Sequence, residues 1–123
     1  KGNKLPRAPR NSASLSARYF WTNSNEDRFW LELISNYQDE AFMSSLNLEN
    51  EILDKRNLAN LRLLYQPNKT DWALDFWIQN ITEQRVNYHS FDQTAFAYTT
   101  AGEALMLNPP RRIGISIIWS PQN

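Results

Sequence analysis

Few side chains in this sequence could do acid–base or nucleophilic chemistry. Two carboxylates, Glu32 and Asp75, lie in separate segments of alternating polarity, and a carboxylate pair is what glycoside hydrolysis uses. Cysteine is absent, which excludes thiolate chemistry, and the single histidine, His89, cannot build a multi-histidine metal centre. Glycine-rich phosphate loops, zinc-protease motifs and nucleophile elbows do not occur. We therefore expect no enzymatic activity and no cofactor or metal.

Arginines supply a simpler role for the two carboxylates. Arg18 and Arg62 fall on the same side of the alternating segments as Glu32 and Asp75. Opposite charges at neighbouring positions of a sheet attract one another, so we predict that each carboxylate pairs with an arginine.

Four further side chains in the long segment 83–110 are candidates for contacting a ligand. Tyr88, His89, Phe91 and Tyr98 could stack on a small molecule or form hydrogen bonds with it. Packing of this segment on itself, with a solvated histidine, is the alternative.

Composition narrows the class of protein. The chain has 123 residues and a mass of 14.5 kDa, which suits one domain or part of a larger one. Its net charge is zero, so nucleic acid is not an expected partner. The mean hydropathy of −0.62 and the lack of a long apolar run exclude a transmembrane helix. Membrane-spanning strands are not excluded by these values, because only alternate residues of such strands face lipid.

Five segments alternate between apolar and polar residues with the period of two that is typical of strands: 12–22, 28–38, 57–65, 72–82 and 111–120. One side of these segments, the apolar side, carries no charge and only one polar residue. It consists of Ala13, Leu15, Ala17, Tyr19 and Trp21; Phe29, Leu31, Leu33, Ser35 and Tyr37; Ala59, Leu61, Leu63 and Tyr65; Trp72, Leu74, Phe76 and Ile78; and Ile113, Ile115, Ile117 and Trp119. The other side, the charged side, holds Arg18, Arg28, Glu32, Arg62, Asp75 and Arg112.

Segment and loop lengths favour a membrane. Globular strands usually have about 5–6 residues, whereas a membrane-spanning strand needs about 9–11. The connections alternate between short (23–27, 66–71) and long (39–56, 83–110), and we expect a short helix near 49–55. In an antiparallel meander, both short turns then lie at one end and both long loops at the other, as in outer-membrane barrels.

Aromatic residues mark the end with the short turns. The apolar side presents there Tyr19, Trp21, Phe29, Tyr65, Trp72 and Trp119. Amphipathic rings gather where hydrocarbon meets water. The alternative is a soluble β-sandwich, in which the apolar side would be buried under a second sheet.

Three stretches together resemble the carboxy-terminal barrel region of TonB-dependent outer-membrane receptors. Residues 2–9, GNKLPRAP, are similar to the family's G-x-x-L-P-x-A-P stretch before a late barrel strand. Residues 72–83 are similar to W-x-h-x-h-x-h-x-N-L-T-D (h, hydrophobic), and residues 110–117 to the closing strand P-R-x-h-G-h-S-h. The family usually ends on an aromatic residue, commonly Phe, whereas here Pro121 stands at that position.

The resemblance implies an all-β fold for residues 1–123: an antiparallel up-and-down meander of about five long strands within a transmembrane β-barrel. It implies a bacterial outer-membrane location, with the short turns periplasmic and the long loops extracellular. It also implies a fragment of an active transporter that imports a siderophore-bound metal, a cofactor or a glycan. The implied partners are outer-membrane lipid, a small-molecule or glycan ligand, and TonB, which a missing amino-terminal part would contact. The alternative function is a soluble β-sandwich that binds, for example, carbohydrate.

Overall fold

The computed structural model describes residues 2–92 and 103–121, and within these only the backbone of Asn50, 88–92 and 103–105. In order along the chain, the strands and the one 3-10 turn are β1 (Ser12–Thr22), β2 (Arg28–Gln38), β3 (Ala41–Phe42), η1 (Glu49–Glu51), β4 (Ile52–Leu53), β5 (Arg56–Gln66), β6 (Trp72–Gln79), β7 (Asn87–Asp92), β8 (Glu103–Leu107) and β9 (Arg112–Trp119). Within this part of the chain, no helix has the length and apolarity needed to cross a bilayer.

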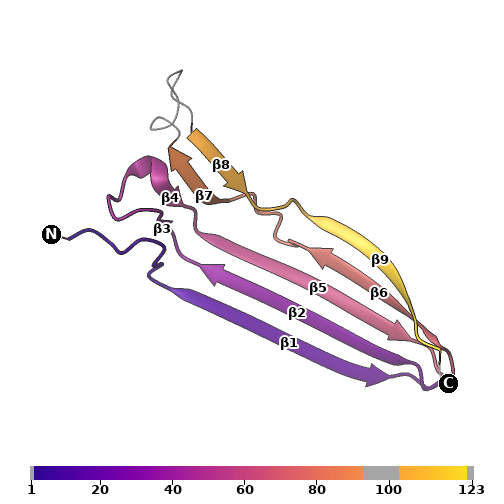
Figure 1. The fold of residues 1–123 in the computed structure, drawn as a ribbon. Helices are drawn as coiled ribbons and strands as arrows, with labels where there is room; N and C mark the ends of the chain where they lie inside the picture. Colours follow the sequence, from indigo (N-terminus) through magenta and orange to yellow (C-terminus); the bar gives the residue numbers. More distant parts are fainter. Residues whose placement is uncertain (1, 93–102, 122–123) are drawn as a thin grey trace. The chain divides into compact units, whose positions relative to one another are not determined.

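The five long strands form one antiparallel sheet in the order β1-β2-β5-β6-β9 (Figure 1). This is a meander, because successive long strands are neighbours in the sheet. It confirms the all-β meander that the alternating pattern predicts. The first three strands have 11 residues each, and β6 and β9 have 8 each, all above the length usual for globular strands.

Strand β6 ends three residues before the predicted boundary. Asn80 takes a left-handed backbone conformation (φ 53°), which a strand does not continue through. Its backbone N–H donates a hydrogen bond to Asn60 Oδ1 at 2.9 Å. Its carbonyl oxygen accepts a hydrogen bond from the backbone N–H of Glu83 at 3.0 Å. A turn therefore replaces the last residues of the predicted segment 72–82.

The two long connections contain short hairpins that the sequence pattern does not predict. Strand β3 pairs with β4, and β7 pairs with β8 around a register shift between Asn87 and His89. The expected short helix near 49–55 is shorter than predicted: it covers Glu49–Glu51 and is a 3-10 helix without a side-chain cap. The residues that follow, Ile52–Leu53, extend instead to pair with β3.

Two compact units divide the chain. Unit 1 comprises 1–13, 37–57 and 84–110, and unit 2 comprises 14–36, 58–83 and 111–123. The buried apolar residues of the described chain are small in number and mostly small in size: Ala41 and Leu53 in unit 1, and Ala59 and Ala73 in unit 2. Unit 2 therefore consists of one sheet layer without a large hydrophobic core.

Candidate membrane-facing surface

The apolar side forms a continuous surface because the strand register aligns its members. Leu63 of β5 lies opposite Phe76 of β6, which in turn lies opposite Ile115 of β9. One step along, Ile78 lies opposite Ile113. Directly opposite residues in antiparallel strands project from the same face of the sheet. The predicted apolar side is thus one face of the sheet.

This face is most exposed on the two edge strands: Ile113 is 71%, Ile117 75% and Trp119 73% accessible on β9, and Tyr19 is 65% accessible on β1. Its members on the inner strands β2 and β5 are half-buried, apart from the buried Ala59. Of the apolar side's members, all of which lie in the described chain, only Ala59 is buried. A soluble monomer rarely leaves an apolar patch larger than a few hundred Å² uncovered. The apolar side is therefore a candidate surface for contact with an apolar medium or partner, although Phe20 and Ile118 on the charged side are also exposed.

An aromatic row, defined as Tyr19, Trp21, Phe29, Tyr65, Trp72 and Trp119, crosses one end of this face. Its ring centroids are 5.5 Å apart for Tyr19 and Trp21, 4.9 Å for Trp21 and Phe29, 4.9 Å for Phe29 and Tyr65, and 6.3 Å for Tyr65 and Trp72. Trp119 is the direct register partner of Trp72. The rings thus follow one another across all five strands, as the sequence predicts.

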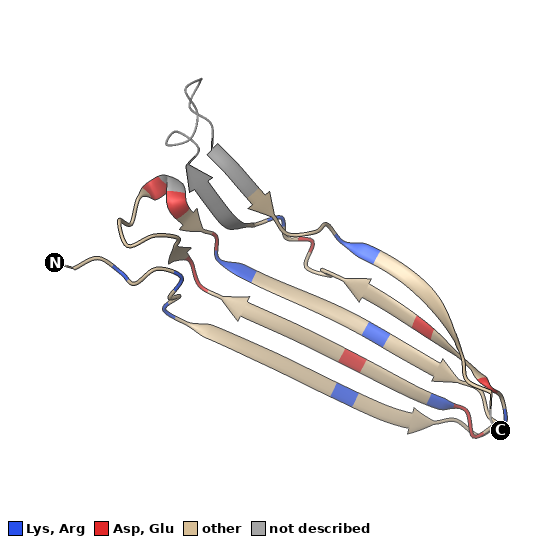
Figure 2. Cartoon of the chain, in the orientation of Figure 1, with Lys and Arg blue, Asp and Glu red and all other residues tan. Residues whose placement is uncertain are grey.

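The charged side carries two ion pairs. Arg18 Nε lies 2.6 Å from Glu32 Oε1. Arg62 donates two parallel hydrogen bonds, of 2.7 and 2.8 Å, to the carboxylate of Asp75. Asp75 is buried, at 8% accessibility. The predicted pairing of each carboxylate with an arginine is confirmed. Figure 2 shows how sparsely charges are spaced along the five strands.

Aromatic rings fill the space beside these ion pairs. Trp77 lies opposite Gly114, and a Cβ on that glycine would approach the indole ring to 2.2 Å. Arg18 stands over the ring of Trp30 at 5.8 Å, and Phe20 stacks on the same ring at 5.3 Å. Gly114 is therefore required by packing, not by backbone conformation.

The two short turns are joined through Asp27. Its carboxylate accepts hydrogen bonds from the backbone N–H of Asn68 (2.9 Å), from Asn23 Nδ2 (2.9 Å) and from the hydroxyl of Tyr65 (3.3 Å). These donors favour the charged form, and they hold the pKa of Asp27 below its usual value of 3.8, with the Asn68 backbone N–H contributing most. These contacts of Asp27 with Asn23, Asn68 and Tyr65, called the Asp27 clamp below, fix both turns beside the aromatic row.

A pH dependence follows from the lowered pKa of Asp27. A carboxylate whose folded pKa is depressed stabilises the fold above its unfolded pKa, and that contribution disappears as pH falls through the folded value. We expect Asp27→Asn to lower the urea midpoint at pH 6 and to flatten its decline below about pH 4. Urea titrations from pH 6 to pH 3 measure this.

Asp71→Asn is the matched control for this prediction. Asp71 lies in the other turn, and within the described residues its carboxylate makes no polar contact. This variant is expected to leave the urea midpoint at pH 6 unchanged. An unchanged profile for Asp27→Asn would show that the clamp contributes nothing.

The sequence-predicted ligand residues are only partly placed. Tyr88, His89 and Phe91 lie in β7, where His89 pairs with Met106 and Phe91 with Ala104 of β8. Tyr98 lies outside the described residues. The ligand role of these four side chains stays a prediction. Within residues 2–92 and 103–121, no cluster of three His, Asp or Glu side chains could hold a metal ion.

Sequence reasoning missed a polar cluster in unit 1. Asp39 accepts hydrogen bonds from Asn11 Nδ2 at 2.7 Å and from the hydroxyl of Tyr37, and these donors lower its pKa from 3.8, Tyr37 contributing most. The ammonium group of Lys55 stands 5.6 Å above the Tyr37 ring. No signal in the sequence indicates this cluster, because its members are up to 44 positions apart (Asn11 to Lys55) and share no spacing rule.

Comparison with known proteins gives no assignment of this chain to a family. No protein-family model, no curated protein and no solved structure matches this chain.

Proposed function

We propose that this chain is a carboxy-terminal segment of the β-barrel of a TonB-dependent receptor in the bacterial outer membrane. The observation that carries the proposal is the exposed apolar side, crossed at one end by the aromatic row. In a bilayer, acyl chains cover the apolar side, and the aromatic rings lie at the depth where hydrocarbon gives way to headgroups.

The other features fit the same placement. The charged side faces the barrel interior, where Arg18–Glu32 and Arg62–Asp75 are tolerated because they are paired. The short turns held by Asp27 lie on the periplasmic side, and the long connections lie outside the cell. Remaining strands close the barrel, since open strand edges are not tolerated in lipid.

The intact protein then imports a scarce nutrient, such as a siderophore-bound metal, a cofactor or a glycan. Energy reaches it through TonB, which contacts a part of the protein outside this chain. The long connections, one of which contains β7 and β8, help to capture the ligand.

The alternative is a soluble β-sandwich that binds carbohydrate on its exposed rings. Tyr19 and Trp119 offer such rings. A sandwich requires a second sheet over the apolar side, and unit 2 contains a single sheet. The membrane placement therefore accounts for more of the observations.

Fluorescence quenching by brominated lipid tests the proposal. Trp30→Phe and Trp77→Phe together remove the tryptophans of the charged side and leave those of the aromatic row, Trp21, Trp72 and Trp119. We expect the chain to require detergent, or vesicles in which the remaining strands close the barrel, and we expect bromine near the headgroups to quench more strongly than bromine at the acyl ends. A monodisperse water-soluble monomer with a cooperative melt and no quenching would refute the membrane placement.

A further inference from the structure

The apolar side has a second boundary, at the end away from the aromatic row. On β9 the position two residues before Ile113 is Arg111. Its Nη2 lies 2.6 Å from Glu83 Oε2 and donates a hydrogen bond to the carbonyl oxygen of Ile81 at 3.0 Å. All four residues belong to unit 2, and the side chains of Arg111 and Glu83 are 39% and 65% accessible. The apolar side therefore ends on β9 at an exposed ion pair.

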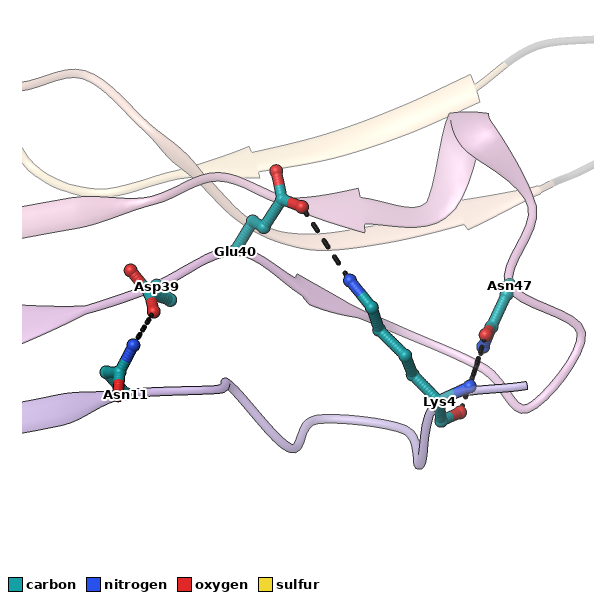
Figure 3. Close-up of polar contacts among 5 residues, drawn as sticks. All are labelled: Lys4, Asn11, Asp39, Glu40 and Asn47. Atoms are coloured by element: carbon teal, nitrogen blue, oxygen red, sulfur yellow. Dashed lines mark hydrogen bonds and ion pairs between the residues drawn. The ribbon is translucent and has the colours of Figure 1, made fainter. Parts of the chain in front are cut away.

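Polar residues also end the apolar alternation on β1 and β2. The next position beyond Ala13 is Asn11, and the next beyond Tyr37 is Asp39. Asn11 Nδ2 donates a hydrogen bond of 2.7 Å to the carboxylate of Asp39 (Figure 3). Each of these strands thus has a defined point at which apolar side chains give way to polar ones.

The extent of the apolar side differs among the strands. It covers eight residue steps on β1 (13–21) and β2 (29–37), but six on β5 (59–65), β6 (72–78) and β9 (113–119). These steps correspond to about 27 Å and about 20 Å along the strand. At the tilt of roughly 35–45° that is typical of membrane barrels, they span about 20 Å and about 15 Å of bilayer depth.

Both ends of the shorter part are fixed by strand register. Trp72 of β6 lies opposite Trp119 of β9, and Ile78 lies opposite Ile113. The two strands therefore begin and end their apolar side at the same level, and the short extent belongs to the sheet and not to a single strand.

We propose that the apolar side on β5, β6 and β9 fits a locally thin bilayer, with Arg111 and Glu83 among the headgroups of the leaflet away from the aromatic row. This inference rests on the proposed function, because it requires acyl chains against the apolar side. A barrel usually presents an apolar band about 25 Å tall, and hydrocarbon of that height would cover the ion pair. Local thinning relieves such a mismatch at a modest cost, and the long arginine side chain can extend to the headgroups.

The double variant Arg111→Leu/Glu83→Leu tests the inference in the closed barrel that contains this chain. It extends the apolar side of β9 by one position. Urea midpoints are measured in vesicles of dilauroyl, dimyristoyl and dioleoyl phosphatidylcholine, in order of increasing acyl length. We expect the midpoint of the variant, relative to the wild type, to rise along this series, because longer acyl chains cover the new leucines. The loss of the ion pair itself is common to all three lipids and leaves this trend unchanged.

Arg112→Leu is the matched control, because Arg112 is the neighbouring exposed arginine on the charged side. Its midpoint relative to the wild type should be the same in the three lipids. No trend for Arg111→Leu/Glu83→Leu, or an equal trend for Arg112→Leu, overturns the thin-bilayer inference and leaves the membrane placement standing. Failure of the barrel to enter any of the vesicles overturns both.

A local measurement covers the case in which the double variant does not fold. Arg111→Cys and Ile115→Cys, each in a cysteine-free barrel, are labelled with an environment-sensitive fluorophore. In dioleoyl phosphatidylcholine we expect the label at position 111 to emit as in the headgroup layer and the label at position 115 to emit as in hydrocarbon. Equally blue-shifted emission at the two positions overturns the inference.

Discussion

Ile115→Arg is expected to destabilise the closed barrel that contains this chain, in phospholipid vesicles, by about 2–4 kcal/mol, the cost of an arginine facing lipid near the bilayer midplane. Ile115 lies in the middle of β9, opposite Phe76 on the apolar side, and is 65% accessible. Neighbouring side chains therefore cannot shield a new charge there. Urea unfolding in vesicles, followed by tryptophan fluorescence, measures the loss.

The adjacent residue provides the control. Ser116→Arg places the same charge on the charged side, directly opposite Asp75, whose carboxylate can accept the new hydrogen bonds. We expect a change of less than about 1 kcal/mol for this variant. The contrast depends mainly on which side of the strand receives the arginine, although Ser116→Arg also removes the acceptor of the 3.4 Å hydrogen bond that Trp77 Nε1 donates to Ser116 Oγ.

A water-soluble fold predicts the opposite result. An arginine at an exposed position in water usually changes stability by about 0.5 kcal/mol or less, and replacing an exposed isoleucine would raise solubility. If both variants were equally stable in vesicles, the apolar side would not be in contact with acyl chains, and the outer-membrane placement would fail.

The five long strands are predictable from sequence because a one-sided environment imposes a period of two on every strand. In β6 and β9 the rule is nearly strict: Trp72, Leu74, Phe76 and Ile78 alternate with Ala73, Asp75, Trp77 and Gln79, and β9 repeats the pattern. Cross-strand register then follows, because a slip of one residue would turn the apolar side chains of one strand to the charged side.

The short hairpins and the long-range polar contacts could not be predicted in the same way. Ala41–Phe42 and Ile52–Leu53 are too short to show any periodicity, and their pairing depends on contacts between residues that are distant in the sequence. A cleft in unit 1 gathers Arg10 from the segment before β1, and Asp39 and Lys55 from the two ends of the connection between β2 and β5. The Asp27 clamp reaches 41 positions along the chain to Asn68. Neither the composition of the sequence nor the spacing of its residues indicates these long-range contacts.

The ion pair between Arg62 and Asp75 is expected to respond unequally to the removal of its two members. The Asp75 side chain is 11% accessible and that of Arg62 is 47% accessible. Arg62→Met therefore leaves a nearly buried carboxylate without its partner, and we expect a loss of about 2–3 kcal/mol, below the 3–5 kcal/mol that is typical of fully buried pairs. Asp75→Leu leaves a guanidinium that water can reach, so its cost is expected to be about 1 kcal/mol.

The double variant Arg62→Met/Asp75→Leu decides whether the lost stability of Arg62→Met comes from the unpaired charge or from lost packing. With no charge left to solvate, we expect it to be more stable than Arg62→Met alone, and a double-mutant cycle of urea unfolding free energies gives the coupling between the two residues. Arg112→Met removes an exposed arginine of the same side and should cost less than about 0.5 kcal/mol. Equal and additive losses for the two single variants would mean that water reaches both charges freely. The difference between the two single variants tests whether the buried carboxylate of Asp75 needs Arg62 to remain stable. Only a charge that is removed from water loses much free energy when its partner is taken away.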